Sequence, residues 1–500
     1  MWRPEVWQAS LLARLAVVAA VTVGFSPCLA YAAEAAQVVG AAKEARWDDL
    51  RNLLEEGGDV NEAEVDGTTA LHWASYWDHL ESTDLLIDAG ADVNAVSDLG
   101  VTSLWPASLN GSVTMVRKLL DAGANPNAAL LSGETPVMTA ARSGAVDVIE
   151  VLLAEGADPN VSATRGQTAL MWAAAQWHSD VVKVLLQHGA DVQVRSDVWQ
   201  QLWQTGADQG THPDHQAWIQ EGGNTPLLFA ARGGDLASAK LLVAADADVD
   251  DESANGLSAT VLAVHSVKDH GYLPRSYRPL PIGGGQRASP HADPQSDGEE
   301  LVEFLLESGA DPNTDAGGYT ALHAAILRRS ERAVRSLLAH GADPNAPLRT
   351  STPVRRASHD FFFDPAFVGA TPFWLAARFE QPNIMRLLAE HGADPLFEHY
   401  VDHWGGGNHE MGWRRVTAGA TTVLMAAVGM PRGRGFPYRQ PEDPAEREAL
   451  TLESARIAVE LGVDVNAANA DGRTALGFAA GLGYDSVVDF LIEVGATPSP

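Results

Sequence analysis

The sequence predicts an all-α repeat fold, in which helix-turn-helix repeats stack side by side and hairpin loops join one repeat to the next. Two recurring phrases carry this prediction. Gly-Ala-Asp-x-Asn or a close variant returns every 33 residues through the first half of the chain, and Gly-x-Thr-Ala-Leu or a variant begins about ten residues after each copy. A fixed period of this length is typical of stacked repeats. The first five copies begin at Gly57, Gly90, Gly123, Gly156 and Gly189.

The first helix of a repeat is marked by the residues that begin it. Thr135 is suited to cap a helix N-terminus, and Pro136 fits the first helical turn, where its missing N–H leaves no hydrogen bond unmade. The alanine pair 140–141 leaves room for another helix to approach closely. We therefore expect a helix that begins at Pro136.

The second helix of the same repeat is marked by apolar periodicity. Val148, Ile149, Leu152 and Leu153 recur at the spacing of one helix face. Gly156 can adopt the left-handed conformation that ends a helix, and the Asp-x-Asn that follows favours a turn. One repeat cannot bury both of its helices alone, so neighbouring repeats must stack.

These phrases resemble the ankyrin repeat, through Thr-Pro/Ala-Leu-His-x-Ala-Ala and Gly-Ala-Asp-x-Asn at a 33-residue period. The resemblance covers nearly all of residues 33–500, about eleven repeats, and implies an ankyrin solenoid with hairpin fingers in a bacterial, secreted protein. Only His72 and His323 keep the motif histidine, and Asp246 stands where glycine is expected. Asp visits the left-handed conformation at a modest cost, so we expect local weakness at Asp246.

The 33-residue period breaks only in the second half of the chain, where the copies follow at steps of 57, 63, 32, 51, 70 and 33 residues. The excess length predicts five inserted segments. Three of them lie between repeats, at 198–221, 349–368 and 398–418. The other two lie between the two helices of one repeat, at 268–298 and 430–449.

Aromatic side chains and histidines are frequent in these insertions. One interpretation is that the rings fold back onto neighbouring repeats and shield them from water. The other is that the rings border a partner-binding surface, because aromatic residues are enriched at binding hot spots. Each interpretation can hold for different rings. The candidates for partner contact are Trp199, Trp203 and Trp404.

A second set of candidates follows from the resemblance, which implies that partners lie across the fingers and the first helices. The two positions after the Ala-Ala pair face this concave surface. Arginines and rings at these positions suit an acidic or extended segment of a partner; the alternative is that arginine is merely a good exposed helix former. The candidates are Tyr76, Trp77, Arg142, Arg232, Arg328, Arg378 and Phe379.

Three large apolar side chains occupy an earlier position of the same helices. Trp73, Trp172 and Phe229 stand where the repeat usually has leucine. Leucine at this position belongs to the framework, so we expect all three rings in the core.

The N-terminus has the features of a secretory signal over residues 1–32. Arg14 precedes an 11-residue apolar run, 15–25, and Ala30 and Ala32 supply small residues for cleavage after Ala32. The alternative is an uncleaved anchor, but a membrane-spanning helix needs about 20 apolar residues. We expect a periplasmic or secreted protein, monomeric, with no membrane span after cleavage.

Charge and cysteine usage narrow the classes of function. Lys and Arg number 34 against 65 Asp and Glu, which gives a formal net charge of −31. This argues against nucleic-acid binding, because such binding needs a basic face that displaces counterions. The single cysteine, Cys28, would leave with the signal, and the rest of the chain would then lack a disulfide, a thiolate zinc site and a cysteine nucleophile.

Motifs for metals, cofactors and catalysis are weak. His399, His403 and His409 lie in the insertion 398–418, but their spacing fits no zinc pattern. The glycine-rich stretch 283–288 lacks the preceding strand and following helix of a dinucleotide site. We therefore expect no cofactor and no catalytic residues.

Together these observations predict a non-enzymatic scaffold that binds another protein on its concave face and its insertion loops. The identity of that protein does not follow from the fold. The alternative function is that of a ligand- or metal-binding accessory protein, which would use the histidine- and tryptophan-rich insertion 398–418.

Overall fold

The structure is a computed structural model that describes residues 37–204, 216–267, 298–350, 363, 365–406, 413–430 and 443–498. The chain divides into two compact blocks. Of the described residues, the first block comprises 37–173 and 183–190, and the second block comprises the rest. The two blocks are described separately below.

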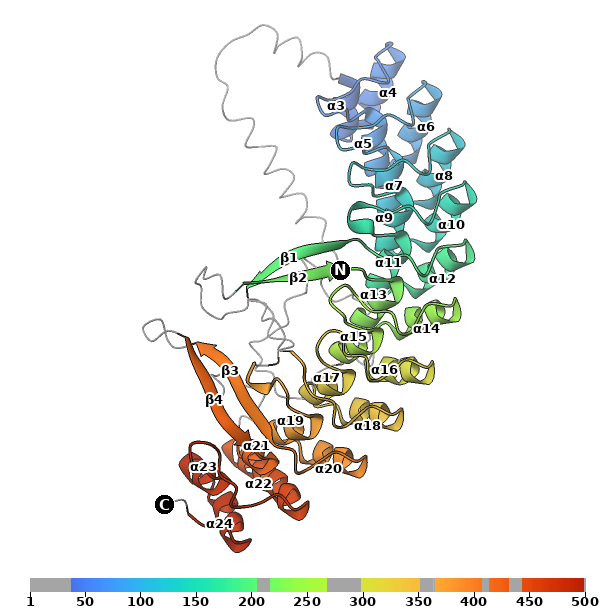
Figure 1. Cartoon of the computed structure of the whole chain (residues 1–500). Helices are drawn as coiled ribbons and strands as arrows, with labels where there is room; N and C mark the ends of the chain where they lie inside the picture. The colour runs from blue at the N-terminus through green and yellow to red at the C-terminus, as the bar shows by residue number, and fades with distance from the viewer. Residues whose placement is uncertain are drawn as a thin grey trace, which may run out of the picture. The chain divides into compact units, whose positions relative to one another are not determined.

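The first block consists of helix pairs that stack in two rows (Figure 1). The first helices of successive repeats, α3, α5, α7 and α9, pack on one another, and so do the second helices, α4, α6, α8 and α10. The bounds are α3 Gln37–Lys43, α4 Trp47–Glu55, α5 Ala70–Tyr76, α6 Leu80–Asp88, α7 Leu104–Asn110, α8 Val113–Asp121, α9 Pro136–Ser143, α10 Val146–Ala154 and the 3₁₀ turn η1 Thr164–Gly166. Helices α11 Ala169–Ala175 and α12 Ser179–Gln187 lie where the chain passes between blocks.

Helix α9 begins and packs as its sequence predicts. The hydroxyl of Thr135 accepts a hydrogen bond from the backbone N–H of Met138, and Pro136 is the first helical residue. The side chains of Ala140 and Ala141 are fully buried. Because these side chains are small, they allow close packing between neighbouring first helices.

Helix α10 buries the predicted apolar stripe. Val148, Ile149 and Leu152 are inaccessible to water, and Leu153 is nearly so. After the helix ends at Ala154, Gly156 adopts a left-handed backbone with φ of 87°. An L side chain is strained in that conformation, so glycine is the residue of choice there.

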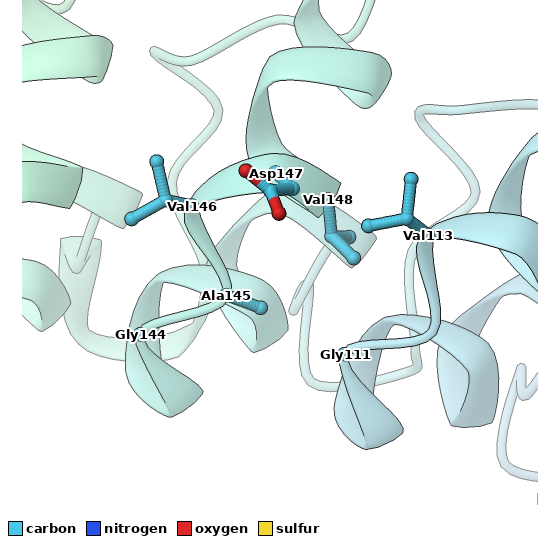
Figure 2. Close-up of a pocket in the computed structure, with 7 residues that line it drawn as sticks. All are labelled: Gly111, Val113, Gly144, Ala145, Val146, Asp147 and Val148. Atoms are coloured by element: carbon cyan, nitrogen blue, oxygen red, sulfur yellow. The ribbon is translucent and has the colours of Figure 1, made fainter.

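A shallow hollow of about 300 Å³ opens between the starts of α8 and α10 (Figure 2). Small and aliphatic residues line it, and Asp147 is the one titratable side chain among them. The lining residues are Gly111, Val113, Gly144, Ala145, Val146, Asp147 and Val148.

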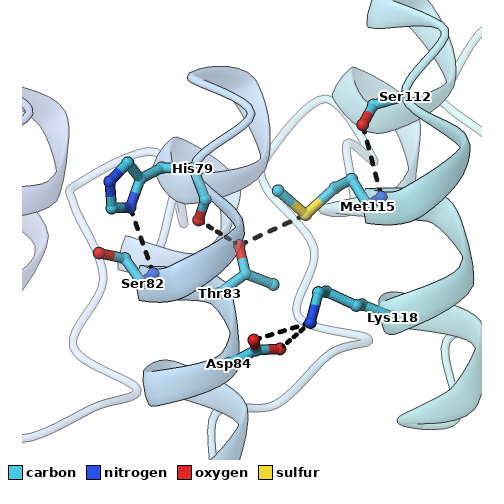
Figure 3. Close-up of polar contacts among 7 residues, drawn as sticks. All are labelled: His79, Ser82, Thr83, Asp84, Ser112, Met115 and Lys118. Atoms are coloured by element: carbon cyan, nitrogen blue, oxygen red, sulfur yellow. Dashed lines mark hydrogen bonds and ion pairs between the residues drawn. The ribbon is translucent and has the colours of Figure 1, made fainter.

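Polar contacts join the second helices of neighbouring repeats (Figure 3). The hydroxyl of Thr83 on α6 donates to the backbone carbonyl of His79 at 3.1 Å and lies 3.3 Å from the sulfur of Met115 on α8. On the exposed side, the ammonium of Lys118 lies 2.5 and 2.7 Å from the two carboxylate oxygens of Asp84. These contacts add directional bonds to an otherwise apolar interface.

A ladder of asparagines joins each repeat to the next. The side-chain amide of Asn94 donates to the carbonyl of Gly123 at 2.9 Å, and its oxygen accepts from the backbone N–H of Asn125 at 2.8 Å. The phrase Gly-Ala-Asp-x-Asn thus supplies a bond between repeats as well as a turn. The same bond recurs along the chain, from an asparagine side-chain amide to the carbonyl of the glycine that follows the second helix of the next repeat. The donors are Asn61, Asn94, Asn127, Asn160, Asn313, Asn345 and Asn466.

The second block repeats the two-row arrangement. Helices α13, α15, α17, α19 and α21 pack in one row, and α14, α16, α18, α20, α22 and α24 pack in the other. The bounds are α13 Pro226–Gly233, α14 Leu236–Ala244, α15 Ala259–Ser266, α16 Gly298–Glu307, α17 Ala321–Leu327, α18 Glu331–Ala339, η3 Pro365–Phe367, α19 Pro372–Arg378, α20 Pro382–Glu390, α21 Val423–Ala427, α22 Pro444–Glu460, α23 Ala475–Leu482 and α24 Asp485–Glu493. The predicted all-α repeat class is confirmed.

Two antiparallel hairpins lie among the helices of the second block, and the sequence pattern did not predict their strands. Strand β1 (Val198–Gln204) pairs with β2 (Gln216–Gly222), and β3 (His399–Gly406) pairs with β4 (Trp413–Thr421). Both hairpins extend the finger loop at places where we expected insertions. The bounds of the five insertions remain predictions.

Gly222 fixes the base of the first hairpin. Its φ is 91°, and a Cβ there would collide with the carbonyl oxygen of Asp197 and the ring of Trp199. Only glycine therefore lets β2 end so close to the start of β1.

Candidate functional site

Exposed aromatic rings gather on α5, a first helix of the first block. The exposed fractions of Tyr76 and Trp77 are 41% and 45%. The rings form a chain of edge-to-face contacts, with centroid distances of 5.8 Å between Trp73 and Tyr76 and 5.1 Å between Tyr76 and Trp77. Edge-to-face packing is a favourable geometry for aromatic pairs.

The rings are held in place by polar contacts. The indole N–H of Trp77 donates to the backbone carbonyl of Lys43 at 3.2 Å, and that of Trp73 donates to the carboxylate of Glu64 at 3.3 Å. The ammonium of Lys43 lies 2.6 Å from Glu64 and 5.4 Å from the centroid of the Trp73 ring. Rings fixed in this way lose little conformational freedom when a partner covers them.

Apolar side chains are also exposed at the finger tips of the same block. Val65, Leu99 and Leu131 are all exposed. Backbone bonds align the fingers, since the N–H of Asp98 donates to the carbonyl of Asp66 at 2.7 Å and that of Leu131 to the carbonyl of Leu99 at 3.0 Å. We call Tyr76, Trp77, Val65, Leu99 and Leu131 the apolar strip.

Trp73, Trp172 and Phe229 are half-buried, so the expectation that they belong to the core is wrong. At least two of these rings take part in surface contacts instead. The guanidinium carbon of Arg142 lies 5.6 Å from the centroid of the Trp172 ring, and Trp73 touches Lys43 as described above. An indole is larger than the leucine that the position usually holds, so it reaches past the helix pair to the surface.

Arg142 itself is neutralised within the block. Its guanidinium lies 2.9 Å from the carboxylate of Glu134. The sequence places Arg142 on the first-helix face correctly, but its charge already has a partner.

In the second block, polar side chains from three repeats converge around His265. The hydroxyl of Tyr319 lies 3.2 Å from the Nε2 atom of His265, and the guanidinium of Arg328 donates to the His265 carbonyl at 2.7 Å. The guanidinium of Arg232 lies 3.3 Å from the side-chain oxygen of Asn224. The sequence did not single out Tyr319.

Burial sets the charge of this cluster. It lowers the pKa of His265 well below its usual value, and the charges of Arg328 and Arg232 lower it further. Burial also raises the pKa of Tyr319 and lowers the pKa of Arg232. The negative charge of Glu221 opposes this lowering of the Arg232 pKa. A neutral imidazole and a neutral phenol therefore lie near two guanidinium groups, and the carboxylate of Glu221 acts on one of them.

Arg378 and Phe379 do not lie on an open surface, contrary to expectation. Their exposed fractions are 9% and 5%. The ring of Phe367 covers them, at 5.8 Å from the guanidinium carbon of Arg378 and 5.7 Å from the ring of Phe379. Phe367 comes from the expected insertion 349–368, so the period alone could not reveal that this segment folds back over α19.

The rings of the expected insertions differ in their surroundings. Phe363 is fully buried and lies 5.4 Å from the ring of Tyr319, so the shielding interpretation holds for Phe363 and Phe367. Trp218 and Tyr400 have exposed fractions of 66% and 67%. Trp199 is half-buried, and the side chains of Trp203 and Trp404 lie outside the described residues.

His399, a candidate metal ligand, has a structural role. Its side chain is buried, its Nε2 atom lies 3.0 Å from the carbonyl of Val368, and its ring lies 4.6 Å from that of Trp374. Burial lowers its pKa. The His403 side chain and His409 lie outside the described residues, and among the described ones no group of three or more His, Cys, Asp or Glu is placed to hold a metal.

The hollow of Figure 2 presents a single carboxylate, with no base or nucleophile beside it. In the described part of the chain, no helix combines the length and apolarity needed to cross a bilayer.

Two family models match the repeats of this chain. A family model described as ankyrin repeats in three copies matches residues 38–130, 104–196 and 295–399, together more than half of the chain. A second model, ankyrin repeats in many copies, matches residues 170–243. Among solved structures, the chain is similar to the human ASB11 ankyrin repeat domain, with 28% identity, 45% of this chain and 89% of that chain covered, and a TM-score of 0.36. No curated protein matches the chain.

Proposed function

The chain belongs to the ankyrin repeat family, whose repeats generally mediate protein–protein interaction, and we propose that it is a non-enzymatic scaffold that binds another protein. The binding surface that we propose runs over the first helices and the finger tips. The apolar strip of the first block is its main part.

The observation that carries this proposal is the pair of exposed, anchored rings, Tyr76 and Trp77. A tyrosine or tryptophan buries about 150–250 Å² when it is covered, and truncation of such a ring at the centre of an interface commonly costs about 2 kcal/mol or more. Hydrogen bonds and ring contacts already order the aromatic chain, so little entropy is lost when a partner covers it.

Further contacts are proposed in the second block. We propose that the two guanidinium groups around His265, those of Arg232 and Arg328, bind an acidic side chain of the partner. Trp199, Trp203 and Trp404 remain candidates in the hairpins. Arg378 and Phe379 are left out, because they are buried.

We also propose that the protein acts outside the cytoplasm, in the periplasm or after secretion, as a monomer. Its support is the signal-like segment 1–32. Sequencing the N-terminus of protein recovered from the cell envelope or the medium tests this proposal, which requires a chain that begins at Ala33.

Affinity capture tests the binding function. The full chain and its Tyr76→Ser/Trp77→Ser variant are used as bait in the same extract, and retained proteins are identified by mass spectrometry. We expect a protein that the wild type retains and the variant loses. Equal retention by both baits would argue against the ring pair as the docking site.

A further inference from the structure

The first block is strongly acidic, which constrains what its apolar strip can bind. Residues 37–173 contain seven Lys and Arg against 21 Asp and Glu, a difference of −14. Two of these seven cations are neutralised within the block, since Lys43 pairs with Glu64 at 2.6 Å and Arg142 pairs with Glu134 at 2.9 Å.

Two carboxylates lie at the finger tips beside the apolar strip. Asp66 follows Val65, Asp98 precedes Leu99, and all four side chains are exposed. Neither Asp66 nor Asp98 forms an ion pair within the part of the chain that the structure describes. The strip thus combines apolar anchors with negative charges that have no cationic partner.

We propose that the apolar strip binds a basic segment of the partner protein, with apolar side chains over the rings and Lys or Arg side chains at Asp66 and Asp98. This inference rests on the proposed function and adds the chemistry of the partner. Cations are also attracted to the faces of Tyr and Trp rings. An acidic segment is repelled here, and so is a second copy of a chain with a net charge of −31.

The arginines that suggested an acidic partner do not oppose this inference. Arg142 is paired with Glu134 and Arg378 is buried, so neither offers a free positive charge on an open surface. The remaining two arginines, Arg232 and Arg328 near His265, belong to the second block.

A pair of synthetic peptides tests the proposal. One alternates lysine and leucine over about twelve residues, and the other has glutamate in place of lysine. Binding of each labelled peptide to the full chain is measured by fluorescence anisotropy at low salt. We expect binding of the basic peptide alone, and a loss of about thirtyfold or more in affinity for the Tyr76→Ser/Trp77→Ser variant.

Two matched charge variants distinguish binding of the basic peptide at Asp66 and Asp98 from its general attraction to an acidic protein. Asp66→Asn/Asp98→Asn preserves side-chain shape, and an asparagine can keep the bond that Asp66 accepts from the N–H of Thr68 at 3.0 Å. Asp147→Asn/Glu150→Gln removes the same charge from exposed positions on α10. We expect the first variant to bind the basic peptide about tenfold more weakly and the second to bind it nearly as the wild type does.

Three results would overturn the proposal: equal or stronger binding of the acidic peptide, equal losses in both charge variants, or self-association of the chain that Tyr76→Ser/Trp77→Ser abolishes. The binding function is judged separately, by affinity capture from an extract. If one of these three results occurs but the Tyr76→Ser/Trp77→Ser variant still loses a protein that the wild type retains, the binding function stands and only the proposed basic chemistry of the partner is wrong.

Discussion

The Nδ1 atom of His323 accepts a hydrogen bond from the backbone N–H of Thr320 at 3.2 Å, at the start of α17. The same arrangement joins His72 to Thr69 at 3.1 Å in α5. An imidazole that accepts at Nδ1 is neutral there, since a protonated ring has no lone pair to offer. Both motif histidines therefore hold their helices in the uncharged state.

This neutrality predicts acid sensitivity. Burial lowers the pKa of His323 to about 4, whereas an unfolded histidine titrates near 6.5. The unfolded chain therefore binds the proton first, and stability that is complete above about pH 6.5 falls as the pH drops toward 4. The difference amounts to ~3 kcal/mol for this one group.

The variant His323→Met tests the assignment, because Met138 and Met171 occupy the equivalent position in other repeats. Urea unfolding at several pH values should show a weaker loss of stability below pH 6.5 in the variant than in the wild type. Parallel curves would contradict a neutral, buried His323.

Asp246 is a site where the chain should gain stability by substitution. It occupies the glycine position after α14 with φ of 65°. Asp246→Gly should raise the free energy of unfolding by about 0.5–1 kcal/mol, because glycine adopts this conformation without steric cost. Asp246→Ala should lower it, and thermal unfolding of the three proteins gives the order. A destabilised glycine variant would contradict the expected local weakness.

Phe363 should contribute to stability and not to partner binding. Its ring is fully buried against Tyr319 and His323. Phe363→Ala should cost about 3–5 kcal/mol through lost burial and a cavity, as measured by urea unfolding. Trp218→Ala is the control, since that ring is exposed, and it should change stability by less than about 0.5 kcal/mol. Similar effects of both variants would refute the distinction between shielding and exposed rings.

The asparagine ladder should couple neighbouring repeats. Asn94→Ala removes bonds to Gly123 and Asn125 in the next repeat. We expect a loss of about 1–2 kcal/mol, because two exposed hydrogen bonds between repeats are broken. Asn52→Ala, on the exposed surface of α4, is the matched control and should have little effect. Equal unfolding midpoints for the two variants would show that the ladder adds nothing.

Much of the repeat fold follows from local rules that the sequence displays. The cap at Thr135, the stripe on α10 and the left-handed Gly156 each depend on a few neighbouring residues, and each is confirmed. The strands of the two hairpins were missed because they arise where the period is interrupted and no repeat pattern describes the chain.

The candidate site was only partly predictable. The rule that the two positions after the Ala-Ala pair are exposed identified Tyr76 and Trp77. The same rule also selected Arg378 and Phe379, which are buried under Phe367. Whether a helix position is open depends on segments that come from elsewhere in the chain. The exposed finger residues carry a signal that could have been used, since Val65 and Leu131 both stand two residues before the glycine of a finger turn.

Hydrogen exchange on the full chain, alone and saturated with a captured partner protein, tests the central claim most directly. The account predicts slower exchange of the finger amides around Val65, Leu99 and Leu131, with no change along the exposed surface of α6 and α8. Protection confined to the second helices, or none at the fingers of the first block, would contradict the proposal that the protein docks its partner on the apolar strip.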